Sequence, residues 1–163
     1  MCEQVNPMPT FTMLIGVPGS GKSTWLAKQS IDWTNTVIVS TDNIIERRAQ
    51  EQGRAYSEVF HKEIKSATSE MNQILRDALA KGLNIINDQT NTTVKSRKNK
   101  LAAFPANYRR VAVFFRTPDD DEHQRRLLSR AGKTIPVAVL NSMKAQLQEP
   151  EAEEGWDEFV YVG

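Results

Sequence analysis

A chain of 163 residues is long enough for one domain with a sizeable core and too short for two comfortable ones. Hydrophobic residues at 39%, charged residues at 25% and 8 glycines exclude collagen-like, low-complexity and wholly disordered classes. The net charge of +1 conceals an asymmetry, because residues 92–134 carry eleven basic and four acidic side chains, or +7, and the remainder carries −6.

Short apolar runs alternate with helical patterns along the chain. Five runs are predicted to be β-strands: residues 11–15, 37–40, 83–87, 111–115 and 159–162. Their apolarity is continuous rather than alternating, which is typical of strands buried on both faces of a parallel sheet. The longest of these runs is far shorter than a membrane-spanning helix requires.

The segments between the strands have helical spacing. Helices are predicted at residues 22–30, 42–52, 57–81, 93–103, 119–131 and 136–148. In the longest, Ser57 is the expected N-cap and Gly82 the expected stop. Strand–helix alternation predicts a single α/β domain with a doubly wound parallel sheet and helices on both faces. Residues 1–9 are expected to be flexible.

A glycine-rich loop follows the first predicted strand and opens the first helix. Residues 16–24, GVPGSGKST, match the phosphate-binding pattern G-x-x-x-x-G-K-[ST] in full. The glycines let backbone N–H groups approach a phosphate, Lys22 can reach its β- and γ-oxygens, and Ser23 suits Mg²⁺. The residues expected to bind the nucleotide are Gly16, Pro18, Gly19, Ser20, Gly21, Lys22, Ser23 and Thr24. This motif predicts a P-loop fold of five strands in the order 2-3-1-4-5, binding ATP with Mg²⁺.

Two acids follow the next strands. Asp42 comes after the second strand and Asp88 after the third, where ligands of open parallel sheets bind. Asp42 could be a helix N-cap or a base that takes the proton of an acceptor hydroxyl, and beside a phosphate loop the second reading is favoured. Asp88 begins a polar cluster, residues 88–91, suited to an acceptor or to a water-mediated metal contact. Gln89 could instead position a water for hydrolysis.

The basic segment 124–135 runs from a helix into a glycine-containing turn and is predicted to form a lid over ATP. Arg130 adjoins the turn and is the expected catalytic arginine, with Arg126 at the nucleotide. A basic helix end favoured by the helix dipole is the alternative reading. The +7 segment fits either polyanion contact or solvated helix charge.

No chemical role is predicted for the histidines, the tryptophans or the cysteine. His61 and His123 have no second ligand at metal spacing and are expected at the surface or partly buried, and the three tryptophans are expected to pack. The single cysteine, Cys2, excludes an internal disulfide. The N-terminus lacks the pattern of a signal peptide, so we expect a cytoplasmic protein without membrane contact.

Several of these motifs together resemble a known family. The phosphate loop, Ser40-Thr41-Asp42, Asp88-Gln89-Thr90-Asn91 and the segment from Arg130 to Pro136 look like the kinase domain of polynucleotide 5′-hydroxyl kinases of the phage and animal end-repair type. The spacing agrees from about residue 11 onward. The combination of D-x-T-N with R-x-G-K-x-I-P is much more specific than the phosphate loop alone.

The resemblance implies transfer of the γ-phosphate of ATP to the 5′-hydroxyl of DNA or RNA. By that mapping Asp42 is the general base, Lys22 and Arg130 neutralise the transferring phosphate, and Ser23 holds Mg²⁺. Asp88, Thr90, Asn91 and Arg48 are the expected acceptor-side residues. The chain lacks a D-x-D-x-[TV] phosphatase motif, so no 3′-phosphatase is expected.

One departure concerns the acceptor. The phage enzymes place an arginine three residues after the base, and this chain has Ile45 there. Arg54 or Arg97 are candidates to hold the acceptor phosphate instead. Two alternatives therefore stay open: a kinase for a nucleoside or other small molecule, and an ATP-binding module that holds nucleic acid without phosphorylating it. Self-association into a homo-oligomer is also left open.

Overall fold

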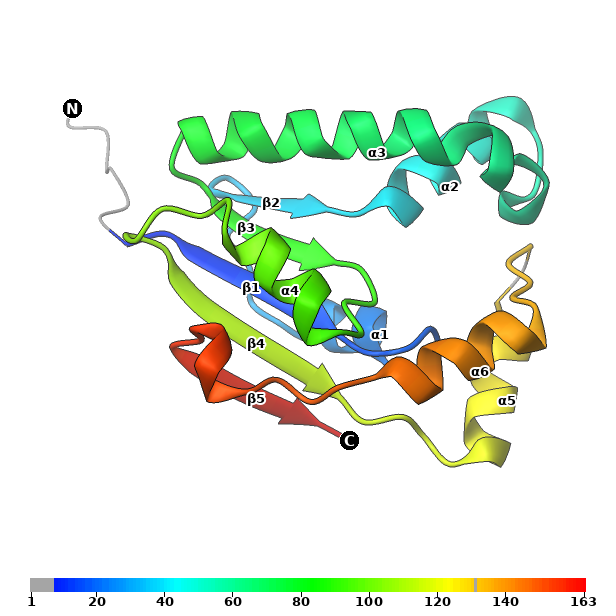
Figure 1. Ribbon diagram of the computed structural model, residues 1–163. Helices are drawn as coiled ribbons and strands as arrows, with labels where there is room; N and C mark the ends of the chain where they lie inside the picture. The colour runs from blue at the N-terminus through cyan, green and yellow to red at the C-terminus, as the bar shows by residue number, and fades with distance from the viewer. Residues whose placement is uncertain (1–7, 131) are drawn as a thin grey trace.

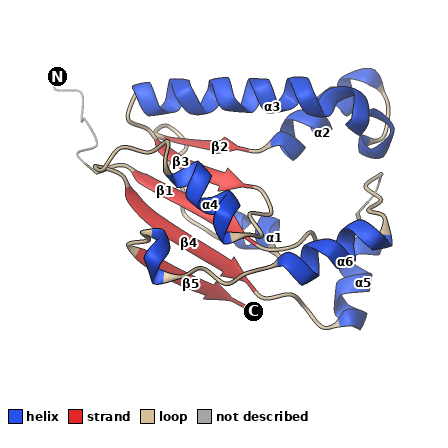
Figure 2. Cartoon of the chain, in the orientation of Figure 1, coloured by secondary structure: helices blue, strands red, loops and turns tan. Residues whose placement is uncertain are grey.

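The computed structural model describes residues 8–130 and 132–163 of the chain. Five strands and six α-helices alternate along this part of the chain, with one short 3₁₀-helix near its end (Figures 1 and 2). The strands are β1 (Thr10–Ile15), β2 (Thr36–Val39), β3 (Asn84–Asp88), β4 (Arg109–Phe115) and β5 (Glu158–Val162). The helices are α1 (Lys22–Ala27), α2 (Thr41–Gln52), α3 (Tyr56–Ala80), α4 (Val94–Leu101), α5 (Asp120–Leu128), α6 (Val137–Gln146) and η1 (Ala152–Glu154).

The five strands form one sheet in the order β2-β3-β1-β4-β5, and every neighbouring pair is parallel. The predicted fold and strand order are confirmed. In this register Leu14 of β1 lies beside Asp88, the last residue of β3, so the loops that follow β1 and β3 leave the sheet at the same edge. Ligands of open parallel sheets bind at that edge.

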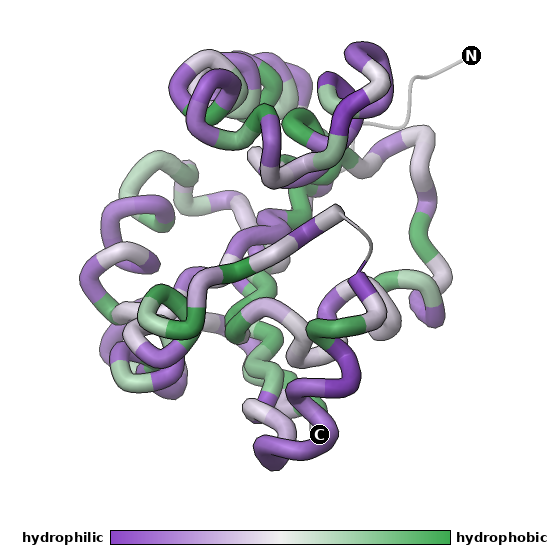
Figure 3. Tube along the Cα trace, turned by 90° about the vertical axis from the view of Figure 1, so that its right-hand side faces the viewer, coloured by the Kyte–Doolittle hydropathy of each residue, from purple (hydrophilic) through white to green (hydrophobic). Residues whose placement is uncertain are grey.

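Apolar side chains fill both faces of the sheet. The larger cluster packs α2, α3 and α4 against one face and includes Phe11, Ile45 and Met71. The smaller cluster packs α1 against the other face around Leu14 and Phe115. Figure 3 shows hydrophobic positions along the central strands and hydrophilic positions on the surrounding helices. The strands are therefore covered on both faces, as their continuous apolarity predicts.

Two helix starts differ from the prediction. Helix α2 is capped by Ser40, whose Oγ accepts from the Asn43 N–H at 3.2 Å, so Asp42 is not the N-cap. Ala55 occupies the N-cap position of α3 without a side-chain bond, so Ser57 is not its cap. The Ser57 hydroxyl instead donates to the Gly132 carbonyl at 3.0 Å and accepts from the Thr134 N–H. The Ser57 hydroxyl is therefore used in a long-range contact and not as a helix cap.

The ends of the helices follow familiar rules. Gly82 comes directly after the α3 C-cap with φ of +64°, in agreement with its predicted role as a stop. Helix α1 ends at Ala27, three residues before the predicted end, because Lys28 and Gln29 donate to carbonyls three residues back in a tightened last turn. Of the predicted flexible start, residues 1–7, with Cys2, lie outside the described part, and Pro9 is buried with its carbonyl accepting from the Arg109 N–H.

Candidate nucleotide and acceptor site

The phosphate loop spans Gly16 to Thr24 between β1 and α1. Gly19 and Gly21 have φ of +78° and +103°, a region that disfavours other residues. A Cβ on Gly16 would lie 2.6 Å from Ser20 Oγ and 2.9 Å from Phe115 Cβ. Helix α1 begins at Lys22, so the N–H groups of its first turn have no acceptor within the helix and point toward the loop. The loop thus presents a positive helix end to an anion.

The Lys22 side chain lies over this loop. Its ammonium donates to the Gly16 carbonyl at 2.9 Å and to the Gln89 carbonyl at 3.4 Å. Burial lowers the Lys22 pKa to about 8, although the negative charges of Asp88 and Asp42 oppose that shift. Both carboxylates line the same cavity as the Lys22 ammonium. The group is available to pair with a phosphate oxygen in place of two neutral carbonyls.

Asp42 and Asp88 line one cavity of about 330 Å³ together with Lys22, Ser23 and Thr90. Asp42 projects from the first turn of α2, and Asp88 ends β3. Burial raises the Asp88 pKa, and the nearby positive charge of Lys22 lowers it in part. Two carboxylates therefore share a cavity with a lysine and a hydroxyl at the carboxyl edge of the sheet. Asp42 and Lys22 lie on the same side of the molecule, as a phosphate-transfer site requires.

Tyr56 holds the Asp42 carboxylate. The Tyr56 hydroxyl donates to Asp42 Oδ1 at 2.6 Å. Burial and the negative charge of Asp42 raise the Tyr56 pKa, so the phenol stays protonated and keeps donating at neutral pH. The Lys133 ammonium lies 4.8 Å from the centre of the Tyr56 ring and pairs with Glu46 of α2. One oxygen of the Asp42 carboxylate is thus occupied by Tyr56.

Basic side chains from α5 and the following turn form another wall of the cavity. Arg126, Arg130 and Lys133 line it, and Nη1 of Arg130 is buried without a hydrogen-bond partner among the described residues. An unpartnered buried guanidinium N–H is costly, and an anion in the cavity would satisfy it. Arg126 Nη1 lies 3.5 Å from the Gly19 carbonyl, so α5 reaches the phosphate loop directly.

His123 lies beneath the same loop. It is fully buried, and its Nε2 lies 2.7 Å from the Pro18 carbonyl, which can only accept a hydrogen bond. A Cβ on Gly19 would lie within 3.3 Å of its ring. The expectation of a surface or partly buried histidine is therefore wrong for His123. The side chain instead fastens α5 under the phosphate loop.

The residues present suit a nucleoside triphosphate with Mg²⁺. Gly16 leaves no room for a Cβ, Lys22 and Arg130 supply cationic donors, and Ser23 and Asp88 supply the hard oxygen ligands that Mg²⁺ prefers. Among the described residues, no three His, Cys, Asp or Glu side chains gather as a metal site. Mg²⁺ would therefore be held by one or two protein oxygens together with phosphate oxygens and water, as is usual for this ion.

The structure brings most of the predicted site residues to this cavity. The predicted residues that line it are Pro18, Gly19, Gly21, Lys22, Ser23, Thr24, Asp42, Asp88, Thr90, Arg126 and Arg130. Gly16 and Ser20 are buried in the loop just below. Asn43 and Glu46 also line the cavity, although the sequence reasoning did not select them. Ser129 and Lys133, which belong to the predicted lid segment, line it as well.

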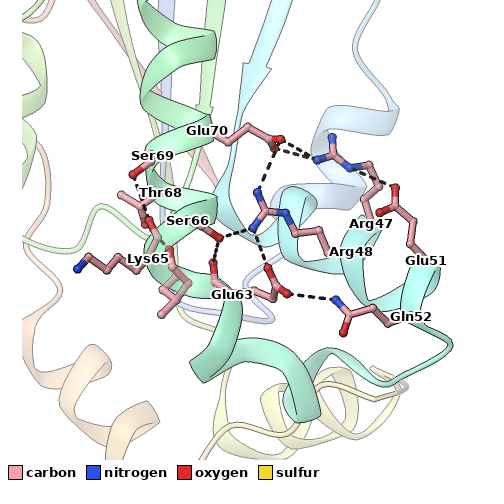
Figure 4. Close-up of polar contacts among 11 residues, drawn as sticks. Arg47, Arg48, Glu51, Gln52, Glu63, Lys65, Ser66, Thr68, Ser69 and Glu70 are labelled. Carbon is pink, nitrogen blue, oxygen red and sulfur yellow. Dashed lines mark hydrogen bonds and ion pairs between the residues drawn. The ribbon is translucent and has the colours of Figure 1, made fainter.

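Arg48 lies outside this cavity, which contradicts its predicted role at the acceptor. Its guanidinium is held between α2 and α3, where it pairs with Glu63 at 2.8 Å and donates to Ser66 (Figure 4). Arg47 pairs with Glu70 at 2.9 Å beside it. Both arginines are used to fasten α2 to α3.

Asn91 and Arg97 are also structural rather than substrate-facing. Asn91 is buried, its amide donates to the Leu14 carbonyl at 2.7 Å, and it adopts a left-handed conformation with φ of +50°. Arg97 is fully buried and pairs with Glu154 at 2.7 Å. Neither side chain can meet an acceptor, so the predictions for both are wrong.

The position at which the phage enzymes carry an arginine faces the core in this protein. Ile45 is fully buried in the larger apolar cluster. Arg54 is exposed after the end of α2 and does not line the cavity. Among the described residues, the basic side chains at the cavity are Lys22, Arg126, Arg130 and Lys133. Within this cavity, an acceptor phosphate would be met by basic side chains of the phosphate loop, of α5 and of residues 130 and 133.

Several charges of the +7 segment are paired with acidic side chains. Besides the Arg97–Glu154 pair, Arg109 pairs with Glu158 at 2.8 Å, and Arg125 and Arg126 both pair with Glu122. The acidic C-terminal segment, residues 149–158, thus neutralises part of the positive charge of the basic segment. Its last stretch forms β5 at the edge of the sheet.

Sequence reasoning missed Tyr56 and His123. Tyr56 lies fourteen residues from Asp42 and carries no motif, so only the three-dimensional structure connects the two. His123 did leave a signal, because it lies three residues before Arg126, a spacing that puts both on one face of α5.

Taken together, the strand order, the glycine loop after β1 and the cavity at the carboxyl edge define a P-loop kinase fold. The family model for the AAA domain matches residues 11–150. The chain therefore belongs to the AAA domain family. Among residues 8–130 and 132–163, no helix combines the length and apolarity needed to span a bilayer.

Known proteins resemble the chain over most of its length. Mouse heterogeneous nuclear ribonucleoprotein U-like protein 2 is 25% identical over 158 residues, which cover 91% of this chain and 21% of that protein. A chain of the Pnkp1/Rnl/Hen1 RNA repair complex has a TM-score of 0.65 at 23% identity, covering 90% of this chain and 46% of its own. A candidate kinase from Chloroflexus aurantiacus has a TM-score of 0.65 at 18% identity, covering 96% and 86%. The chain thus spans about a fifth of the mouse protein and less than half of the repair-complex chain.

Proposed function

We propose that the chain is a kinase that transfers the γ-phosphate of ATP to the 5′-hydroxyl end of DNA or RNA. The observation that carries this proposal is the shared cavity in which Asp42, fixed by Tyr56, faces Lys22 and the unpartnered Arg130. The nucleic-acid acceptor is supported by the names of two similar proteins, a ribonucleoprotein and a component of an RNA repair complex.

In this proposal each wall of the cavity has its own task. The backbone N–H groups of the phosphate loop and the Lys22 ammonium hold the β- and γ-phosphates. Asp42 accepts the proton of the acceptor hydroxyl while that oxygen bonds to the γ-phosphorus and the bond to the β–γ bridging oxygen breaks, leaving ADP. Arg130 contacts the oxygens of the transferring phosphate. Ser23 and Asp88 would hold Mg²⁺, which neutralises the triphosphate charge.

The hydrogen bond from Tyr56 explains how Asp42 is positioned to act as the base. The Tyr56 hydroxyl occupies one carboxylate oxygen, so the remaining oxygen faces the acceptor in a fixed orientation. Tyr56 acts through Asp42 and is a positioning residue. Lys133 lies over its ring and pairs with Glu46, so the segment predicted to be a lid contacts the base wall.

A labelled-ATP assay tests the acceptor. Wild-type protein is given γ-labelled ATP with 5′-hydroxyl DNA, 5′-hydroxyl RNA, nucleosides and a panel of small hydroxylated compounds. Label on the oligonucleotides supports the proposal, with the matching 5′-phosphorylated oligonucleotides as the negative control. Label on small compounds alone would refute it.

A small-molecule acceptor is a second candidate, favoured by one observation. Ile45 is buried, and the acceptor side of the cavity presents the acids Asp42 and Glu46 rather than an arginine from α2. Ionic strength distinguishes the two candidates, because contacts to several phosphates make the acceptor KM rise steeply with salt. A small neutral acceptor would show little salt dependence. Binding of nucleic acid without any label transfer would instead indicate the ATP-dependent binding module.

A further inference from the structure

A second cavity of about 520 Å³ lies between α3 and α4, on the face of the sheet opposite α1. Figure 1 shows α4 in front of the strands, with α3 running above it. The cavity is larger than the one at the phosphate loop and within the size range of small-ligand sites. Gln89, at the end of β3, lines both cavities, so the second opens beside the acceptor side of the first.

The chemistry of the lining changes from floor to rim. The floor is apolar and includes an aromatic pair, whose rings stack with centroids 3.8 Å apart. It is formed by Phe11, Val39, Met71, Leu75 and Phe104. Side-chain amides stand around it and offer both donors and acceptors, as the edge of a nucleobase does. These amides belong to Asn72, Asn87, Gln89 and Asn99.

Two lysines give the cavity its charge. Lys95 and Lys100 of α4 line it, and none of the described lining residues is acidic. Burial lowers the Lys100 pKa to about 8, and its ammonium donates to Asn91 Oδ1. An ammonium group carries three donors, so this contact leaves donors for an anionic ligand. The half-buried Lys100 ammonium has no carboxylate at its cavity to balance its charge, so an anionic ligand would do so.

We propose that the cavity between α3 and α4 is a second ligand site that binds a nucleotide unit, a planar heterocycle bearing a phosphate. The apolar floor takes the ring, the amides contact its edge, and Lys95 with Lys100 meet the phosphate. The unit is either a free nucleotide or part of a polynucleotide whose end lies at Asp42, and the second source rests on the proposed function.

The site is joined to the phosphate loop by a short chain of hydrogen bonds. Lys100 donates to Asn91, and Asn91 donates to the Leu14 carbonyl just before the loop and to the Gln89 carbonyl at 3.3 Å. The same Gln89 carbonyl accepts from Lys22. A ligand at Lys100 therefore contacts a group that is three hydrogen bonds from the phosphate-binding lysine.

Binding with the phosphate loop filled tests the second site. Wild-type protein is saturated with a non-hydrolysable ATP analogue and titrated by calorimetry with AMP or with a short 5′-hydroxyl oligonucleotide. We expect a saturable binding event. Binding of AMP identifies free nucleotide as a ligand, whereas binding of the oligonucleotide alone identifies the polymer. No binding by either probe would overturn the proposal.

Two pairs of variants locate the event. Asn99→Trp fills the cavity, whereas Lys98→Trp places the same side chain on the exposed neighbouring position of α4, outside the lining. We expect binding to weaken about tenfold or more in Asn99→Trp and to stay unchanged in Lys98→Trp. Lys95→Met against Lys98→Met tests the charge with no cavity filling. Equal binding in both members of each pair would refute the site.

These results are independent of catalysis. If no 5′-hydroxyl acceptor is phosphorylated, the proposed function fails, but AMP binding that is lost in Asn99→Trp still establishes the second site. If phosphorylation succeeds while both tryptophan variants bind alike, the second site fails and the proposed function stands.

Discussion

Two walls of the nucleotide cavity are held in different ways. The wall that carries Asp42 is the hairpin of α2 and α3, in which Ile44, Ile45 and Ala49 pack into the apolar core. Ion pairs of Arg47 and Arg48 with acids of α3 add to that packing (Figure 4). The wall that carries Arg130 runs from α5 to α6, and it exposes Leu128 and Val137 at 83% and 71%.

The second wall meets the first through polar contacts. Ser57 bonds to Gly132 and Thr134, and Lys133 pairs with Glu46. Polar contacts near the surface contribute less to stability than apolar burial, so the wall that carries Arg130 is held less firmly than the wall that carries Asp42. The lid expected for residues 124–135 stays a prediction. In the proposed kinase, the base would lie on the firmly packed wall, and the arginine that meets the transferring phosphate would lie on the more weakly held one.

The largest expected effect comes from the fixed wall. Asp42→Asn removes the proton acceptor and should lower kcat about 10³-fold, within the range of general-base catalysis. ATP binding, measured by calorimetry, should stay nearly unchanged. Asp77→Asn, an exposed residue of α3, is the matched control. A turnover in Asp42→Asn equal to that of Asp77→Asn would remove Asp42 from the mechanism.

The wall that carries Arg130 should give the next largest effect. Arg130→Met removes the guanidinium whose buried Nη1 has no hydrogen-bond partner among the described residues, and it should lower kcat about 10²-fold. Arg125→Met is the control, because Arg125 lies near the end of α5, five residues before Arg130, and pairs with Glu122 outside the cavity. Steady-state kinetics with saturating ATP make the comparison. If the two variants behave alike, Arg130 has no role in transfer.

The contact within the base wall should give a smaller effect. Tyr56→Phe removes the hydrogen bond to Asp42 and should lower kcat about tenfold, the worth of one such bond. The KM for ATP should not change, because Tyr56 does not line the phosphate loop. Tyr161→Phe on the exposed face of β5 controls for loss of a phenol. Equal changes in kcat and in ATP KM would indicate a general structural role instead.

The smallest effect should come from pH. Because burial lowers the Lys22 pKa to about 8, the ammonium loses its proton as pH rises through that value, and phosphate attraction falls with it. We expect kcat/KM for ATP to fall a few-fold above pH 8, since this ratio reports the free enzyme. Lys22→Arg keeps its charge there and should lack that limb. The same limb in Lys22→Arg would assign the titration to another group.

The fold was predictable because its signals are local. Continuous apolar runs mark the strands, and the glycine-rich loop 16–24 marks the end of β1 and the start of α1. Asp42 and Asp88 could be placed at the cavity because both follow parallel strands, whose carboxyl ends share an edge. Those positions follow from topology and need no knowledge of side-chain packing.

The failures share one physical cause, which is competition between local and distant partners. The sequence predicts Ser57 as a helix cap, but its hydroxyl bonds to the Gly132 carbonyl. It predicts Arg48 as a substrate ligand, but the Arg48 guanidinium pairs with Glu63. Asn91 is polar and follows a strand, yet its amide fastens the loop after β3 to Leu14 of β1 and Asn87 of β3. Sequence shows which groups can bond, but only the folded chain shows which partner each one meets.

The buried Arg97–Glu154 pair has a consequence for where the folding unit ends. The family match stops at residue 150, but Arg97 of α4 is fully enclosed and its countercharge lies four residues further on. A chain cut at residue 150 would lose the carboxylate that pairs with Arg97 together with the edge strand β5. The sheet and its packing therefore extend past the family boundary, and the acidic C-terminal residues are an integral part of the fold.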